Sequence, residues 1–213
     1  MGTLGKLYGR FILQLRGRNH IVGWGMKPEE ATAFIKNLGK TMLTFYGYTV
    51  KYNDPEGMLK IIRDVLSGVS PETTLVNAGA TGSMGAALYP TAKSMGFITT
   101  GIVSTMQLQY PDDINPAVDH ICFIEDTLWG GNLPNSTDLS PTSQAMVACS
   151  DLLVAIGGNE IVRDELLAAQ ALGKPIQYFP ADMDHASAFR RAEYLKLPPP
   201  ESFHGAAHEV FGK

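Results

Sequence analysis

Short apolar runs alternate with helix-like segments along this chain, and this alternation limits the folds open to it. Phe97–Val103, His120–Glu125 and Leu152–Ile156 are mostly apolar, which is typical of strands buried on both faces of a sheet. Helical segments such as residues 55–67 and 160–172 separate most of the strands. Strands alternating with helices predict an α/β, Rossmann-like fold with a parallel sheet flanked by helices on both faces.

Further elements follow from the same patterns. Strands are predicted at His20–Trp24, Thr73–Asn77 and Pro175–Phe179, and a helix at Met84–Met95. Another helix is predicted to begin at Lys27–Glu30, where Pro28 and two acids suit a first turn. After this start, the following apolar residues fall at helical spacing: Phe34, Ile35, Leu38 and Met42.

We predict one Rossmann-like domain over residues 1–195, with its core at about residues 73–180. The Pro-rich tail, residues 196–213, is predicted to be a loose extension or to pack against a partner.

Composition and charge exclude several classes of protein. The net charge is −4 and charged residues make up 18% of the chain, which argues against a nucleic-acid binder or a binder of anionic membranes. The segment "GKLYGRFILQLRGR" holds only a short apolar run between arginines, too short for a signal peptide or a membrane span. Cys122 and Cys149 lie in or beside apolar runs and are predicted to be buried thiols. We therefore predict a cytoplasmic protein.

A glycine-rich turn, "AGATGSMG", follows the strand Thr73–Asn77 and opens a helix. Glycines let backbone N–H groups approach an anion closely, and the first turn of a helix offers unpaired donors for a phosphate. The spacing is not that of the standard dinucleotide turn, and a tight turn without a ligand is the alternative. The predicted ligand-binding residues here are Gly79, Ala80, Thr81, Gly82, Ser83, Met84 and Gly85.

A second turn of this kind follows the strand Leu152–Ile156. Gly157, Gly158, Asn159 and Glu160 lead into the next helix, and we predict that they bind the sugar side of the same ligand. A carboxylate just past the glycines is badly placed for a phosphate but well placed to accept hydrogen bonds from ribose hydroxyls. The alternative is that Asp164 and Glu165 merely favour the first half of the helix.

These motifs resemble those of the SLOG/LOG superfamily, Rossmann-like proteins once labelled lysine decarboxylases that include cytokinin-releasing phosphoribohydrolases. "AGATGSMG" is similar to the family turn GGG-x-x-G-L-M-G. "SQAMVACSDLLVAI" is similar to the family's methionine helix and following strand, and "IGGNEIVRD" to its P-G-G-x-G-T-x-x-E turn. The resemblance covers about residues 73–180. It implies a nucleotide-type ligand and, in an active enzyme, a catalytic acid at Asp164 or Glu165.

This sequence departs from the enzymes at positions that matter for phosphate. Thr142 stands where the enzymes carry an arginine, and Glu160-Ile161 stand where they carry Gly-Thr. A carboxylate near a phosphate repels it. We therefore expect a pocket without the hydrolase reaction. Arg163 could restore a cation, although an exposed helix arginine explains it equally well.

Two other motifs carry weaker hypotheses. Trp129, with Gly130, Gly131 and Asn132, could form a lid whose indole stacks on a base, or it could simply anchor a surface loop. Asp182, Asp184 and His185 could hold a metal ion, although Asp182 as a helix cap is the commoner arrangement. We predict no metal and no cofactor beyond the nucleotide ligand.

The sequence leaves three functional classes open. The first is a protein that binds a nucleotide or phosphorylated nucleoside as a sensor, carrier or regulator. The second is an N-glycosidic phosphoribohydrolase acting on nucleoside 5′-monophosphates, and the third is a scaffold whose pocket has decayed. We also predict a homodimer, because the helices around Pro90–Met95 and Met146 carry small and apolar residues with few charges.

Overall fold

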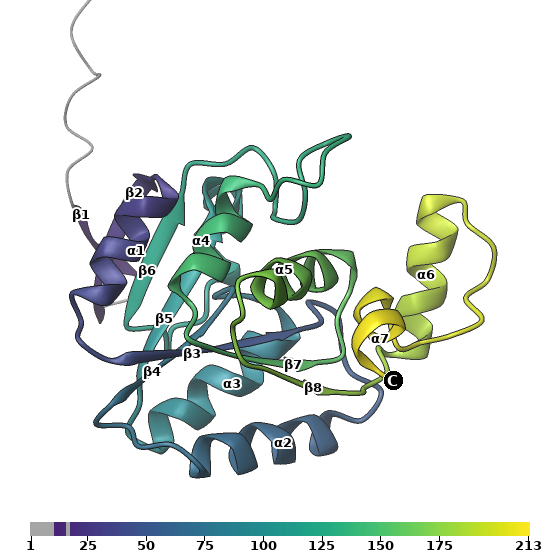
Figure 1. Cartoon of the computed structure of the whole chain (residues 1–213), viewed down its shortest axis with the longest axis horizontal. Helices are drawn as coiled ribbons and strands as arrows, with labels where there is room; N and C mark the ends of the chain where they lie inside the picture. Colours follow the sequence, from purple (N-terminus) through teal and green to yellow (C-terminus); the bar gives the residue numbers. More distant parts are fainter. Residues whose placement is uncertain (1–10, 16–17) are drawn as a thin grey trace, which may run out of the picture.

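The computed structural model describes residues 11–15 and 18–213, and side-chain surroundings from residue 23 on. One sheet of eight strands runs through the molecule in the order β1-β2-β6-β5-β4-β3-β7-β8 (Figure 1). The strands are β1 (Phe11–Leu15), β2 (Arg18–Met26), β3 (Thr41–Gly47), β4 (Thr74–Ala78), β5 (Ile98–Ser104), β6 (His120–Ile124), β7 (Leu152–Ile156) and β8 (Ile176–Phe179). All neighbouring pairs are parallel except the edge pair β1–β2.

Helices cover both faces of the sheet (Figure 1). The helices are α1 (Pro28–Lys36), α2 (Pro55–Ser67), α3 (Gly82–Ser94), α4 (Pro141–Cys149), α5 (Glu160–Ala171), α6 (His185–Leu195) and α7 (Ala206–Phe211). One apolar cluster joins α2 and α3 to the sheet, and the other joins α1, α4 and α5 to its opposite face. The α/β, Rossmann-like fold predicted from the sequence is confirmed.

The central strand β3 is the main feature that the sequence patterns misassign. Met42 was predicted to continue a helix, but α1 ends at Lys36 and Met42 lies in β3. After the C-cap residue Asn37, Gly39 adopts φ +68°, a left-handed conformation that costs glycine little and that separates the helix from β3. The residues that follow, "TMLTFY", are rich in the β-branched and aromatic side chains that favour strands.

The helices from which the homodimer is predicted bury one side within the chain. Ala92, Ala145 and Cys149 are buried in the two apolar clusters. α4 lies against α1 and α5. Ala148, by contrast, is exposed, and Thr91 and Met95 are half-buried, so the homodimer stays a prediction.

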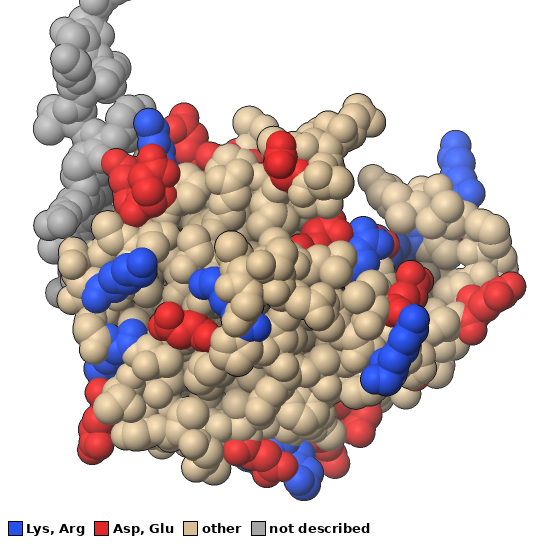
Figure 2. Space-filling view, viewed as in Figure 1, with Lys and Arg blue, Asp and Glu red and all other residues tan. Residues whose placement is uncertain are grey.

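Other expectations concern the surface and the termini. Both cysteines are buried and free, as predicted. No helix among the described residues is long and apolar enough to span a membrane. The N-terminal segment used to predict the location lies partly outside the described residues, and its residues 11–15 form β1. Acidic and basic side chains are interspersed over the face seen in Figure 2, without a basic field.

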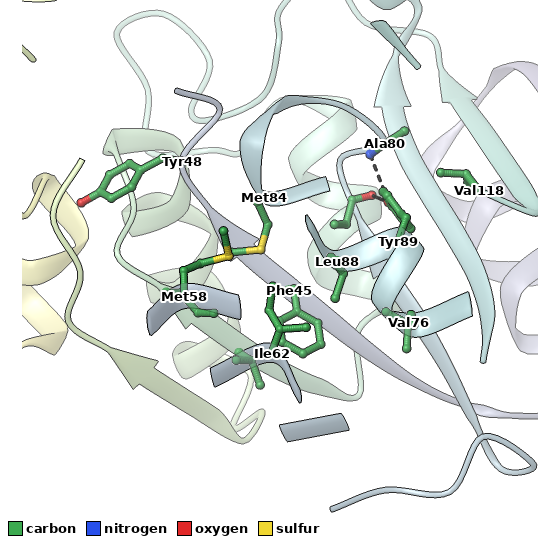
Figure 3. Close-up of a cluster of buried hydrophobic side chains, with 14 of the residues drawn as sticks. Phe45, Tyr48, Met58, Ile62, Val76, Ala80, Met84, Leu88, Tyr89 and Val118 are labelled. Carbon is green, nitrogen blue, oxygen red and sulfur yellow. Dashed lines mark hydrogen bonds between the residues drawn. The ribbon is translucent and has the colours of Figure 1, made fainter. Parts of the chain in front are cut away.

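The hydroxyl group of Tyr89 ties the first glycine turn to the sheet (Figure 3). It accepts a hydrogen bond from the Ala80 N–H at 3.1 Å and lies 2.9 Å from the carbonyl oxygens of Ala78 and Thr100. Tyr89 is fully buried, and Ala80 holds an uncommon positive φ of 35°. This contact therefore fixes the turn in its bent conformation.

We expect Tyr89→Phe to lower the free energy of unfolding by about 1–3 kcal/mol, because it leaves buried backbone groups without a partner. Chemical denaturation measures the loss. The matched control is Tyr194→Phe, since that side chain is 85% exposed. Equal stability of the two variants would contradict this role for the Tyr89 hydroxyl.

Candidate functional site

A cavity of about 400 Å³ lies at the carboxyl ends of β3, β4 and β5 and beside the start of α5. Its volume lies within the range of small-molecule sites. Its walls come from segments far apart in the sequence, namely Phe45–Thr49, Ala78, Gly79, Thr81, Met84, Gly85, Ile102–Ser104, Gln107, Trp129, Thr142, Met146, Asn159, Ile161, Val162 and Glu165. The cavity therefore brings together both of the predicted motif regions.

The position of the cavity follows from the topology. From β3 the chain adds β4, β5 and β6 on one side of the sheet, and later β7 and β8 on the other. Crossovers that leave in opposite directions open a crevice at the carboxyl ends of the strands where the order reverses. Here β3 lies between β4 and β7, so the crevice forms around its end.

Some residues of the glycine turn after β4 line the cavity, and others pack in the core. Gly79, Thr81, Met84 and Gly85 line the cavity. A Cβ added to Gly79 would meet no atom within 4 Å, so this glycine leaves open space. The fully buried Ala80 belongs to the apolar cluster with α2 and α3, and its methyl group fills the space beside Gly101.

Two of the first amides of α3, predicted to bind phosphate, already have partners. The N–H groups of Ser83 and Met84 donate to the carbonyl oxygens of Thr49 and Tyr48, at 3.1 and 3.3 Å. Gly82 has φ +75°, and a Cβ there would lie 2.9 Å from the Cα of Thr49. This end of α3 therefore packs against the segment after β3.

The glycine turn after β7 is covered by the chain itself. A Cβ on Gly157 would lie 2.5 Å from the ring of Tyr48. The carbonyl of Gly158 accepts a hydrogen bond from the Ala207 N–H of α7 at 3.1 Å. The C-terminal extension, predicted to be loose or bound to a partner, thus packs on this turn and against α5.

The polar residues of the second turn point in different directions. Asn159 lines the cavity, and its side-chain oxygen caps α5 by accepting from the Val162 N–H at 3.3 Å. Glu160 instead pairs with Arg191 of α6 at 3.0 Å, in a separate hollow between α6 and α7. The structure therefore does not bring Glu160 together with the cavity residues.

The two predicted acids also differ in their surroundings. Asp164 accepts from the Arg163 guanidinium at 2.8 Å, which engages the cation considered for phosphate. Glu165 lies in the cavity wall with 4% of its surface exposed. The Ser143 hydroxyl donates to its Oε1 and in turn accepts from the Gly131 N–H at 2.7 Å. Burial raises the pKa of Glu165 to about 8, against the effect of the Ser143 hydrogen bond.

Sequence reasoning missed several polar groups in the cavity wall. Tyr46 and Thr142 are each only 4% exposed. The Thr142 hydroxyl has no hydrogen-bond partner among the described residues, whereas the Tyr46 hydroxyl lies beside Ser150. Tyr46 was missed because β3 was not predicted, although a glycine after the run "TFY" marked the strand end. Buried hydroxyls in a cavity wall can be satisfied by a ligand or by ordered water. Among the described residues, the cavity lining includes no lysine, arginine or histidine.

The proposed metal-binding acids lie away from this cavity. Asp184, not Asp182, caps α6 by accepting from the Ser187 N–H at 2.8 Å. Asp182 contacts His204 and lies 3.6 Å from His185. Within residues 11–15 and 18–213, no three His, Cys, Asp or Glu side chains are grouped so as to hold a metal ion.

Comparisons with known proteins find similarity in fold. No protein-family model matches the chain. No curated protein sequence matches it either. Solved structures with a similar fold include three from different organisms. The Moco carrier protein from Chlamydomonas reinhardtii is 22% identical, with a TM-score of 0.46, over 66% of this chain and 76% of that one.

The second is the molybdenum cofactor binding protein from the phototrophic bacterium Rippkaea orientalis, 18% identical, with a TM-score of 0.47, over 74% of this chain and 85% of that one. The third is DNA processing protein A from Streptococcus pneumoniae, 11% identical, with a TM-score of 0.47, over 83% of this chain and 62% of that one.

Glu165 predicts a specific dependence of stability on pH. In the unfolded chain its carboxyl ionises near 4.5, whereas in the fold it stays protonated up to about 8. Between these values the unfolded state is favoured progressively as the pH rises. We therefore expect Glu165→Gln to gain stability over the natural chain from about pH 5 to pH 8, by up to about 1.4 kcal/mol per pH unit.

Denaturation curves at several pH values measure this difference. The control is Glu193→Gln, which changes an exposed carboxyl on α6. A stability difference for Glu165→Gln that does not change with pH would mean that the buried carboxyl ionises normally.

Proposed function

We propose that this protein binds a nucleotide or a similar phosphorylated heterocycle reversibly in the cavity, as a carrier or sensor. The observation that carries this proposal is the cavity at the reversal of the strand order, with the Thr142 hydroxyl in its wall without a partner among the described residues. Ligands of open α/β sheets bind at this place. The cavity is large enough for a heterocycle with part of its sugar.

The charges of the cavity indicate which end of such a ligand lies inside. The described part of its lining holds the Glu165 carboxyl and no basic side chain. A buried phosphate without a cation would be costly, whereas a neutral ring or a sugar hydroxyl would not. In this proposal the ring and sugar fill the cavity, and the phosphate lies towards Gly79 and Thr81, where the Thr81 side chain forms no capping hydrogen bond.

A thermal screen over mono-, di- and cyclic nucleotides tests the proposal. At a concentration about 100 times its Kd, a ligand stabilises the native state by about 2.7 kcal/mol. For a chain of this size we expect a rise in melting temperature of roughly 5–10 °C. Mass spectrometry of small molecules that copurify with the protein would identify the ligand independently. No response in the screen and no copurifying molecule would favour the scaffold class instead.

Gly79→Val should abolish the shift. The new side chain would point into open space and fill part of the cavity, so the fold itself should tolerate it. This variant is sharper than one at Gly82, where a side chain would strain the turn. Gly68→Ala, at the end of α2, is the matched control, since a Cβ there makes ordinary contacts. An unchanged shift in Gly79→Val would place the ligand elsewhere.

A hydrolase remains the second candidate, because Glu165 is a protonated acid in the cavity wall at neutral pH. Such a group could protonate the base as it leaves. The described lining residues include no basic side chain that would orient a ribose phosphate for attack. We therefore expect no detectable release of base from nucleoside 5′-monophosphates, measured by chromatography. Turnover on the order of 1 per second or more that is lost in Glu165→Gln would establish the enzyme instead.

A further inference from the structure

The indole of Trp129 forms part of the cavity wall and is also 49% exposed. It lies near Tyr110, which is 52% exposed, with the ring centroids 6.2 Å apart and the planes inclined by 35°. A large aromatic side chain is more often buried against the core. Here the two rings stand at the border between the cavity and the surface.

The chain before Trp129 is fixed to the cavity wall. The carboxylate of Asp126 accepts from the Leu128 N–H at Oδ1 and from the Thr142 N–H at Oδ2, both at 2.9 Å. The Ser104 hydroxyl donates to the carbonyl oxygen of Asp126 at 3.2 Å. The indole is therefore held beside the cavity by β5 and α4.

The chain after Trp129 lies against Glu165. A Cβ built on Gly130 would lie 3.0 Å from the Ser143 Oγ and 3.7 Å from the Glu165 Oε1. The Gly131 N–H donates to the Ser143 Oγ, and Ser143 donates to Oε1. Trp129 is thus followed directly by Gly130 and Gly131, whose backbone lies against Ser143 and the buried carboxyl of Glu165.

One oxygen of this carboxyl stays free. Ser143 engages Oε1, and no other described residue forms a hydrogen bond or ion pair with Glu165. Glu165 lines the cavity and is 96% buried, since 4% of its surface is exposed. Oε2 has no hydrogen-bond partner among the described residues, and a ligand in the cavity can form a hydrogen bond with it.

We propose that the ligand places a flat heteroaromatic ring in this corner, with the Trp129 indole stacked on its face and the Glu165 Oε2 hydrogen-bonded to its edge. This inference rests on the proposed function and adds the part of the ligand that is recognised. A ring face suits an indole, and a ring nitrogen or exocyclic group suits a single carboxyl oxygen. A sugar phosphate without a heteroaromatic ring would use neither the Trp129 indole nor the Glu165 carboxyl in this way.

The chain contains two tryptophans, which makes the contact directly observable. Trp24 lies on β2 with its ring centroid 5.8 Å from that of Phe123, and it does not line the cavity. In Trp24→Phe all tryptophan emission comes from position 129. We expect adenosine or guanosine 5′-monophosphate to change this emission in a saturable way. The reciprocal variant Trp129→Phe, which keeps Trp24, should show no change.

Affinity gives the second readout. Stacking on an aromatic side chain contributes enough that Trp129→Leu should raise the Kd of either monophosphate by between about 5-fold and 100-fold. Trp129→Phe should lose less, because a smaller ring remains. Glu165→Leu should also weaken the monophosphates. Ribose 5-phosphate, the matched probe without a heteroaromatic ring, should bind weakly. None of these substitutions should change its Kd.

The outcomes separate the two proposals. If no monophosphate changes the melting temperature or the emission, the proposed function fails and this inference falls with it. If the monophosphates raise the melting temperature but Trp129→Leu binds them as well as the natural chain does, the inference alone is wrong. Equal binding of ribose 5-phosphate and adenosine 5′-monophosphate would overturn it as well, since the ring would then contribute nothing.

Discussion

The reversal of strand order at β3 is the constraint on which the site depends. Parallel strands need crossover connections, and those on either side of β3 run in opposite directions along the sheet. The carboxyl ends of β4, β3 and β7 therefore cannot all be closed by the crossover helices. Tyr46, Gly79 and Glu165 come from three different parts of the chain, and all three line the cavity at these strand ends.

The chemistry of this space differs from that of a typical phosphate site. Two of the amides at the start of α3 are bonded to the segment after β3, and the nearby Arg163 is bonded to Asp164. What remains is a largely apolar cavity with uncharged hydroxyl groups and one carboxyl whose pKa is raised by burial. An environment of this kind disfavours buried charge and favours a neutral, polar-edged ligand.

The sequence patterns locate most of the fold because buried parallel strands are visible as apolar runs. β7 has the predicted bounds, and β5 and β6 differ from the prediction only at their ends. β3 could not be separated from α1, since Met42 continues the helical spacing and the break at Gly39 is a single residue. Because the sequence patterns do not predict β3, they also do not identify Tyr46 and Tyr48, which lie between the two glycine turns, as candidate site residues. The acid that faces the cavity is Glu165, because α5 directs Asp164 towards Arg163.

Glycine turns mark close approach of the backbone, but they do not say what approaches it. A Cβ would find open space at Gly79, the backbone of Thr49 at Gly82 and the ring of Tyr48 at Gly157. The same residue type thus serves a cavity in one case and the packing of the chain on itself in the other two. The C-terminal extension also needs a glycine at this contact, since a Cβ on Gly205 would collide with the carbonyl oxygen of Gly158. The turn after β7 therefore needs Gly157 beside Tyr48 and Gly158 beside Val162 and Ala207, whether or not a ligand reaches Asn159.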